Sequence, residues 1–283
     1  MQTPTEVSHD INSLVEAAGA LSMTTMPGRA KAQVVVVTGG TAGIGEACAI
    51  ALLKDSATAV LINGRDPARA QASLARLRQG FPEARIECAL GDMCDPADAK
   101  RVMAFAHAKF ERIDVLINST GGNDIPALLH STALEDIPDI LRRCLSAQIL
   151  SCRAALPYMR EAGRGIVVNI ASDAAKVPTP GEAVIGAAMA GIVMFTRALA
   201  VEGKRDGIRA NVVTPSMTSG TTHFEKVMND PFASRIFEKA RRAAALGVVD
   251  RHELAGLVAF LASPAAAKIT GQAISMTGGI SAV

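Results

Sequence analysis

The segment QVVVVTGGTAGIGEA, residues 33–47, joins an unbroken apolar run to a glycine-rich turn. A continuous apolar run is typical of a strand that is buried on both faces of a parallel sheet. The glycines permit a tight turn, and the helix pattern that follows at 43–54 places its N-terminus where it attracts a pyrophosphate. The segment therefore predicts a strand, a turn and a helix that together bind a nucleotide.

The same alternation of strand and helix continues along the chain. Further strands are predicted at 58–63, 84–90, 113–118, 165–172, 208–214 and 272–276, with helix patterns between them and no linker or internal repeat. Two of the helices begin with an Asp-Pro pair, at Asp66 and Asp95, which is a common N-cap arrangement. We therefore expect an α/β fold with a single Rossmann-type, doubly wound parallel sheet and helices on both faces.

The predicted domain covers residues 31–283, including a lid segment at 216–247, and residues 1–30 are expected to be a loosely ordered N-terminal extension. In such sheets ligands bind beyond the carboxyl ends of the strands, where the strand order reverses. The extension lacks the basic start and long apolar run of a signal peptide.

Composition excludes several other classes of function. The net charge is +2 without a basic block, which argues against nucleic acid, and no run is expected to reach the ~18 apolar residues of a membrane span. The cysteines form no C-x-x-C pair, which predicts reduced thiols rather than disulfides or a metal site. We therefore expect a cytoplasmic protein that acts on a small molecule and binds no metal, nucleic acid or membrane.

Seven motifs together carry a family resemblance. In chain order they are TGGTAGIG, GDMCD, INSTGG, AALPYM, GIVVNIAS, GIRANVVTPS and ITGQAISMTGG. On these motifs the chain resembles a classical short-chain dehydrogenase/reductase (SDR) from residue 33 to its end. The resemblance implies an oxidoreductase that uses a nicotinamide dinucleotide. It also implies a homodimer or homotetramer, paired through helices at 134–161 and 182–204.

The resemblance also assigns cofactor-binding positions. Asp92 would bind the adenine amino group, with Met93 beside it, and Thr218 would reach the carboxamide, or Thr221 if the register slips. The glycine turn, the residues near the adenine ribose and those near the nicotinamide would supply the remaining contacts: Thr38, Gly39, Thr41, Gly43, Ile44, Gly45, Asn118, Ser119, Gly121, Pro215 and Ser216.

The residues after the second strand favour NADP(H) over NAD(H). Proteins that use NAD place an acid at the position of Gly64, where it binds the ribose 2′-hydroxyl. Arg65 follows instead, and a guanidinium suits a 2′-phosphate through paired hydrogen bonds. The alternative is that Arg65 is an ordinary surface arginine.

The family resemblance also exposes a departure at the reacting centre. The family uses an asparagine, a serine, a tyrosine and a lysine, and only the serine is kept, as Ser172. Ile185 and Met189 stand at the tyrosine and lysine positions, and Cys144 stands at the asparagine position. Residues four apart share a helix face, so Ile185 and Met189 are expected to present an apolar turn that cannot transfer a proton.

Other side chains could replace the tyrosine as proton donor. Lys176, four residues after Ser172, is our first candidate, and Asp173, Glu182 and His223 are alternatives, although each also has an ordinary structural interpretation. Two functions stay open. One is an NADP(H)-dependent oxidoreductase with a non-standard site for a small apolar carbonyl, alcohol or activated alkene. The other is a catalytically silent, nucleotide-holding subunit that supports an active SDR partner in a hetero-oligomer.

Overall fold

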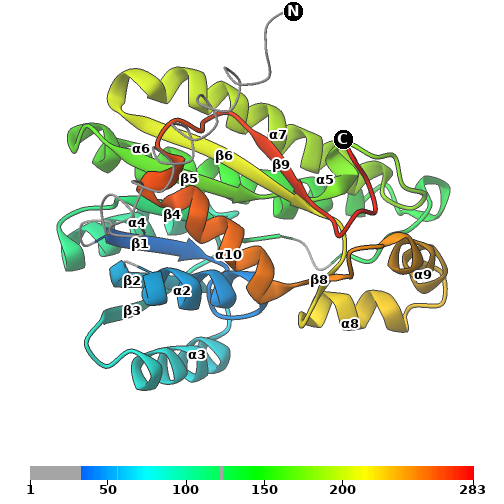
Figure 1. Cartoon of the computed structure of the whole chain (residues 1–283), viewed down its shortest axis with the longest axis horizontal. Helices are drawn as coiled ribbons and strands as arrows, with labels where there is room; N and C mark the ends of the chain where they lie inside the picture. The colour runs from blue at the N-terminus through cyan, green and yellow to red at the C-terminus, as the bar shows by residue number, and fades with distance from the viewer. Residues whose placement is uncertain (1–32, 56, 122–123) are drawn as a thin grey trace, which may run out of the picture. The chain divides into compact units, whose positions relative to one another are not determined.

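The computed structural model describes residues 33–55, 57–121 and 124–283, and the prediction for residues 1–30 lies outside them. Seven strands form one sheet, and every neighbouring pair is parallel (Figure 1). Their spatial order is β3 (Arg85–Leu90), β2 (Ala57–Gly64), β1 (Gln33–Thr38), β4 (Val115–Asn118), β5 (Gly165–Ile170), β6 (Ile208–Pro215) and β9 (Ala273–Met276). This is the predicted doubly wound sheet.

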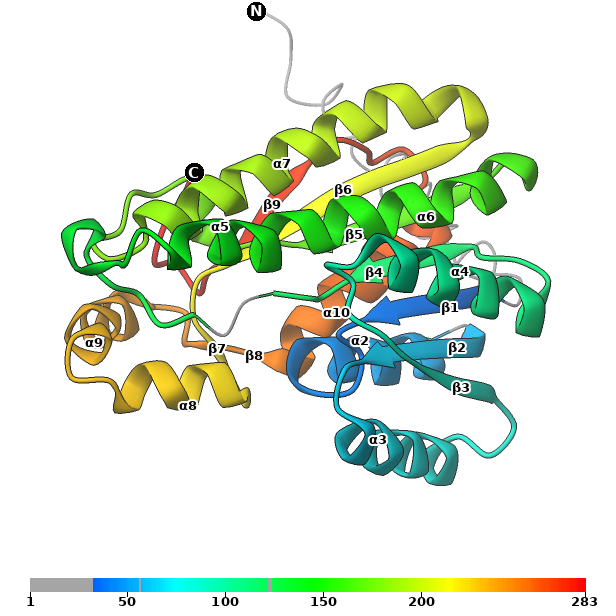
Figure 2. The ribbon, with the colours of Figure 1, turned by 180° about the vertical axis from the view of Figure 1, so that it is seen from behind.

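Helices cover both faces of the sheet, which explains the unbroken valine run in β1. Val35 and Val37 pack with one set of helices, and Val34 and Val36 pack with the other. The first set is α2 (Gly43–Asp55), α3 (Pro67–Gly80) and α10 (Arg251–Ala262). The second set, seen from behind in Figure 2, is α4 (Pro96–Phe110), α6 (Ala147–Glu161) and α7 (Ala183–Gly203).

Local sequence signals set several helix boundaries. Asp66 accepts a hydrogen bond from the Arg69 backbone N–H at 3.0 Å, and Asp95 accepts bonds from the N–H groups of Ala97 and Asp98. The predicted N-caps of α3 and α4 are therefore confirmed. The long helix predicted to end near 161 is interrupted: α5 (Asp136–Leu141) leads into a π-helical turn, Arg142–Ser146, before α6. Such turns widen a helix and often occur at functional sites.

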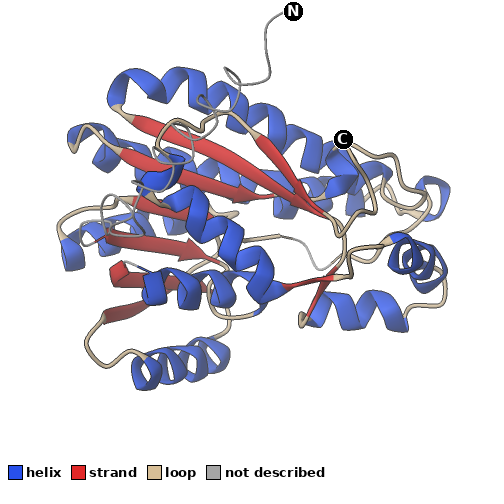
Figure 3. Cartoon of the chain, in the orientation of Figure 1, coloured by secondary structure: helices blue, strands red, loops and turns tan. Residues whose placement is uncertain are grey.

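The segment 216–247 lies beyond the carboxyl ends of the strands. It contains β7 (Thr218–Ser219), α8 (Thr222–Asn229) and α9 (Ala233–Ala243), and β7 pairs with β8 (Val249–Asp250) in a small second sheet. Short 3-10 turns complete the described elements, namely Leu129–Ser131, Asp173–Ala175, Lys204–Asp206 and Pro264–Ala266. In Figure 3 the helices α8 and α9 lie beside the ends of the strands, and residues of both helices line the cavity described next.

One stretch of the described chain, Ala183–Asp206, is long and apolar enough to cross a membrane by length and composition. The stretch is not an unbroken apolar run of the kind that the sequence analysis considered, because Arg197, Glu202 and Lys204 interrupt it. The finding is weak evidence for a span, because core helices of globular proteins pass the same test, and α7 packs against β6.

Candidate functional site

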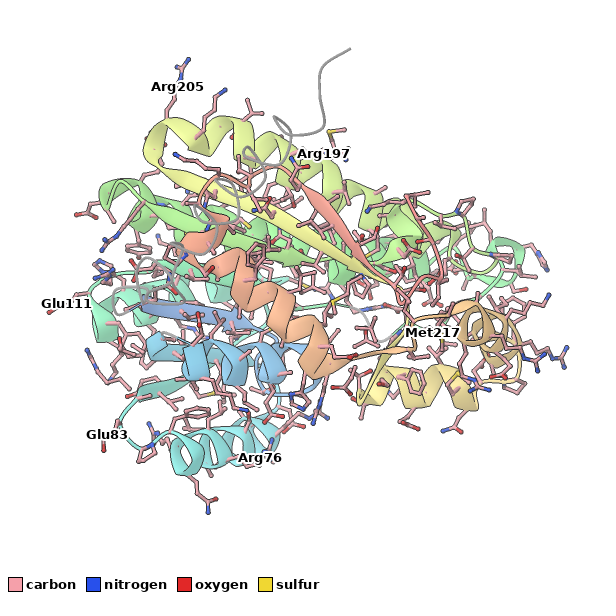
Figure 4. All side chains as sticks on the ribbon, viewed as in Figure 1. Arg76, Glu83, Glu111, Arg197, Arg205 and Met217 are labelled. Carbon is pink, nitrogen blue, oxygen red and sulfur yellow. The ribbon has the colours of Figure 1, made fainter. Side chains whose placement is uncertain are left out.

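A cavity of about 930 Å³ opens at the carboxyl ends of the strands. Its walls come from the residues at the ends of β1, β2, β4, β5 and β6 and from α7, α8 and α9. Figure 4 labels Met217 of this wall, where the chain leaves β6 for α8. Most of the residues that the sequence assigned to cofactor and chemistry meet here.

The glycine turn forms one wall, and its backbone requires glycine. Gly39 and Gly43 have φ values of +66° and +54°, which other residues rarely adopt. A Cβ at Gly39 would lie 2.6 Å from the Ser119 carbonyl oxygen, and one at Gly45 would lie 2.3 Å from the Gly39 carbonyl oxygen. Since α2 begins at Gly43, its unpaired first N–H groups lie at this wall, as a bound pyrophosphate requires.

Three residues predicted as cofactor contacts do not line the cavity. Thr38 donates a hydrogen bond to Asn118 Oδ1 at 2.9 Å, and Asn118 donates to Asn169 Oδ1 at 2.9 Å. Asn169 in turn donates to Thr196 of α7 at 2.8 Å, and all four side chains are fully buried. Thr38 and Asn118 therefore connect β1, β4, β5 and α7 rather than contact a ligand. The third residue, Gly45, packs against the backbone of Gly39 in the glycine turn.

Another part of the cavity wall contains Asp92, Met93 and Arg65, which were predicted to contact the adenosine part of a cofactor. The guanidinium of Arg65 lies 3.9 Å from the Asp92 carboxylate, with 61% of its side chain exposed, so this weak ion pair leaves it available to a ligand. Arg69, in the first turn of α3, lines the same wall. Arg69 was not predicted from the sequence, although its place four residues after Arg65 was a usable signal.

The space around Gly64 is too small for the acidic side chain that proteins using NAD have at this position. A Cβ at this residue would lie 2.5 Å from the hydroxyl of Thr41. A carboxylate side chain would therefore require Thr41 to move, so this wall is shaped against the residue that proteins using NAD place at this point.

Two threonine hydroxyls of the cavity wall lack a hydrogen-bond partner among the described residues. Pro215, Ser216 and Thr218 line the cavity as predicted. The hydroxyls of Thr218 and Thr120 are buried, with no hydrogen-bond partner among the described residues. Thr221, the alternative to Thr218, caps α8 by accepting from the Phe224 N–H at 3.1 Å, so its oxygen already has a partner. A ligand with amide or hydroxyl groups, such as a nicotinamide riboside, fits these unpaired hydroxyls.

The residues at the expected reacting centre also lie together. Ser172, Ile185, Met189 and Cys144 all line the cavity, and the last three belong to one apolar cluster. The Ser172 oxygen accepts a hydrogen bond from the Ala174 N–H at 3.2 Å. Because that contact uses the oxygen as acceptor, the hydroxyl hydrogen is left to donate to a ligand.

Lys176 lies elsewhere, contrary to its role as first candidate for proton donor. Its ammonium donates to the Ala273 carbonyl, the Ser275 hydroxyl and the Val283 carbonyl at 2.9, 2.7 and 3.1 Å. Burial lowers the pKa of this lysine, but its three donors are all satisfied by the C-terminal segment. Neither Lys176 nor Asp173 is among the residues that line the cavity.

Two of the alternative donors do line the cavity, Glu182 and His223. Burial raises the pKa of Glu182, which precedes α7, and lowers the pKa of His223 in α8. Asp124 and Arg143 join them and form an ion pair at 2.6 Å. Sequence reasoning missed this pair because the two residues come from separate segments with no shared motif. Among the described residues, no group of acidic, histidine and cysteine side chains could hold a metal ion.

Comparison with known proteins agrees with this arrangement. A family model described as short chain dehydrogenase matches residues 33–231. A 3-oxoacyl-[acyl-carrier-protein] reductase of Synechocystis sp. is 33% identical, with 88% of this chain and 97% of that protein covered. A D-threitol dehydrogenase of Mycolicibacterium smegmatis is 34% identical, with 89% and 94% covered.

A solved structure is also similar. It is a gluconate 5-dehydrogenase from Burkholderia cenocepacia in complex with NADP and tartrate. It has a TM-score of 0.81 and 27% identity, and the match covers 90% of this chain and 98% of that one.

Proposed function

Because this chain belongs to the short-chain dehydrogenase family, we propose that it is an NADP(H)-dependent oxidoreductase with a non-standard active site. Its substrate is a small, moderately apolar carbonyl compound, alcohol or activated alkene. One observation carries the proposal: a single cavity is lined by the glycine turn and Arg65 and also by Ser172, Ile185 and Met189. A cytoplasmic location is part of the proposal, supported by five cysteines, all in the described residues, that form no disulfide.

The residues of the cavity have separate tasks. A bound nicotinamide dinucleotide supplies or accepts a hydride. The glycine turn and the N-terminus of α2 would hold its pyrophosphate, and the unpaired hydroxyls of Thr218 and Thr120 would be available to its other polar groups. The hydroxyl of Ser172 donates a hydrogen bond to the substrate oxygen. Ile185 and Met189 form an apolar wall that excludes water from the reacting atoms.

The preference for NADP(H) rests on two guanidinium groups at the adenine end. Arg65 and Arg69 line the same wall, and a 2′-phosphate accepts hydrogen bonds from such groups in pairs. Residue 64 is a glycine, so no acidic side chain is present there to bind the 2′-hydroxyl of an NAD ribose. The gluconate 5-dehydrogenase that resembles this chain holds NADP.

Replacement of Arg65 tests the cofactor preference. We expect Arg65→Ala to weaken NADPH binding about 10- to 100-fold, because a hydrogen bond to a charged group contributes about 1.5–3 kcal/mol, while NADH binding stays unchanged. Fluorescence titration of both nucleotides measures this. Arg205→Ala is the matched control, since Arg205 is exposed and outside the cavity (Figure 4). An equal loss for NADPH and NADH, or no loss, would contradict the preference.

A silent subunit is the second candidate function, and the apolar cluster of Cys144, Ile185 and Met189 favours it. The two functions are separated by NADPH oxidation over a panel of ketones, acyl thioesters and enones with the purified chain alone. Turnover supports the oxidoreductase. Tight NADPH binding without turnover, with activity only beside an active relative, supports the silent subunit.

A further inference from the structure

We infer that His223 supplies the proton in place of the missing tyrosine, with Asp124 as its positioning residue and Arg143 as the anchor of Asp124. The inference rests on the proposed oxidoreductase function. The three side chains come from the loop after β4, the π-helical turn before α6, and the first turn of α8. All three line the cavity that also contains Ser172 and Ile185.

The ion pair between Arg143 and Asp124 fixes one side of the carboxylate. Arg143 donates to Asp124 Oδ1 at 2.6 Å, and its other nitrogen lies 3.7 Å from Asp139. The side chain of Asp124 is only 18% exposed. Its second oxygen, Oδ2, is buried and has no hydrogen-bond partner among the described residues. A buried carboxylate oxygen of this kind favours a nearby donor.

His223 has the complementary requirement. Its Nδ1 is buried and also has no hydrogen-bond partner in the part of the chain that the structure describes. Burial lowers the pKa of the imidazole, the charge of Asp124 raises it, and the charge of Lys226 lowers it. Both residues line one cavity, and the charge of Asp124 favours the imidazolium form that a proton donor needs, against the larger effect of burial.

The other candidate proton donors suit this role less well. Glu182 precedes Ile185 by three residues, and burial raises its pKa while Thr179 acts on the pKa in the opposite direction. The ammonium of Lys176 is bound by the C-terminal segment. Arg143 stays protonated under all working conditions. Among these candidates His223 has the ordinary pKa nearest neutrality, and its Nδ1 has no hydrogen-bond partner among the described residues.

The proton transfer balances with the hydride that the cofactor supplies. During reduction the substrate oxygen gains the proton of a His223 N–H bond, and the electron pair of that bond stays on the ring nitrogen. The imidazolium becomes neutral imidazole, which takes a new proton from water. During oxidation the neutral imidazole removes the alcohol proton instead, and Ser172 donates a hydrogen bond to the same oxygen.

The test is His223→Gln, with His130→Gln as the control, because His130 is exposed and outside the cavity. We expect His223→Gln to lower kcat/KM for reduction about 10²- to 10⁴-fold, the range of a general acid, while NADPH affinity is retained. Wild-type reduction should decline as pH rises toward about 6.5 and be largely lost above it, because burial holds the pKa of His223 below that ordinary value. The variant should lack this decline, and added imidazole should restore part of the rate of His223→Ala.

Asp124→Asn tests the positioning role. Without the carboxylate the imidazolium is less stable, so the decline of the reduction rate with rising pH should occur at lower pH. We also expect kcat to fall more than KM changes. A structural role alone would leave the decline at the same pH.

The outcomes separate the two proposals. If the wild-type chain turns over substrate and His223→Gln keeps its rate and pH profile, the His223 inference is overturned and the oxidoreductase proposal stands. The His223 inference is also overturned if the rate of the variant falls but its decline with rising pH remains and imidazole restores no activity. It is likewise overturned if Glu182→Gln alone abolishes the rate. If the wild-type chain binds NADPH but turns over nothing, the oxidoreductase proposal fails, and the His223 inference fails with it.

Discussion

At the scale of single residues, the chemistry of the cavity depends on two hydrocarbon side chains. Met189 is 9% exposed and packs with Cys144 and Ala171, while Ile185 is half-buried at the cavity wall. Neither can donate or accept a proton at any pH. A lysine introduced at 189 would enter an apolar cluster, which disfavours its charge and lowers its pKa.

The double substitution Ile185→Tyr/Met189→Lys tests whether the rest of the pocket supports ordinary carbonyl reduction. We expect a gain in ketone reduction of up to about 10²-fold, the lower end of the general acid–base range, because Cys144 still occupies the asparagine position. NADPH absorbance over the ketone panel measures it. Ile185→Phe/Met189→Leu is the control of similar volume without ionisable groups. Equal rates in the two double variants would argue against a pocket that is otherwise intact.

At the scale of elements, a buried carboxylate joins strands at the end of the sheet away from the cavity. Asp114 precedes β4 and accepts a hydrogen bond from the Val34 N–H of β1 at 2.8 Å. The guanidinium groups of Arg112 and Arg164 lie 2.6 and 3.3 Å from its other oxygen. Its side chain is 7% exposed, so these contacts are shielded from solvent.

Asp114→Asn should therefore lower stability without affecting the site. We expect a loss of about 1–3 kcal/mol in the free energy of unfolding, since a neutral amide cannot accept the charge-assisted hydrogen bonds of Arg112 at the buried oxygen. The midpoint of urea unfolding measures this, and NADPH affinity should be unchanged. Asp206→Asn is the control, because its pair with Arg160 is largely exposed and contributes little. Similar losses in the two variants would contradict the role given to Asp114.

At the scale of the whole molecule, the outer face of α7 lacks a covering element among the described residues. Met194 and Val201, seven residues apart on one helix face, are 62% and 64% exposed. Only 39% of the most apolar window of this helix is buried. We propose that a second copy of the chain covers this face, as the family resemblance implies for its long helices.

Met194→Glu/Val201→Glu should then lower the mass of the particle in solution. Light scattering after gel filtration measures this, with the wild-type chain expected as a dimer or tetramer. Leu246→Glu is the control, because Leu246 is an equally apolar residue that is 87% exposed but lies outside α7. A monomeric wild type, or a mass that the double variant leaves unchanged, would exclude this interface.

The sequence by itself determined the features that depend on near neighbours. The valine run, the glycine turn, and the caps at Asp66 and Asp95 each act within a few residues, so their patterns predict the structure directly. The spacing of Ile185 and Met189 likewise predicted a shared helix face, and both residues line the cavity. Short-range geometry fixes φ, periodicity and capping whatever the rest of the chain does.

Only the tertiary structure decided which side chains reach the cavity. It directs Lys176 to the C-terminal segment, buries Thr38 and Asn118 beneath the site, and distinguishes the unpaired Thr218 from the helix cap Thr221. It also brings Asp124, Arg143 and His223 to one cavity from three separate segments. These outcomes depend on contacts between residues far apart in the chain, and a loop side chain has no periodicity from which its direction could be predicted.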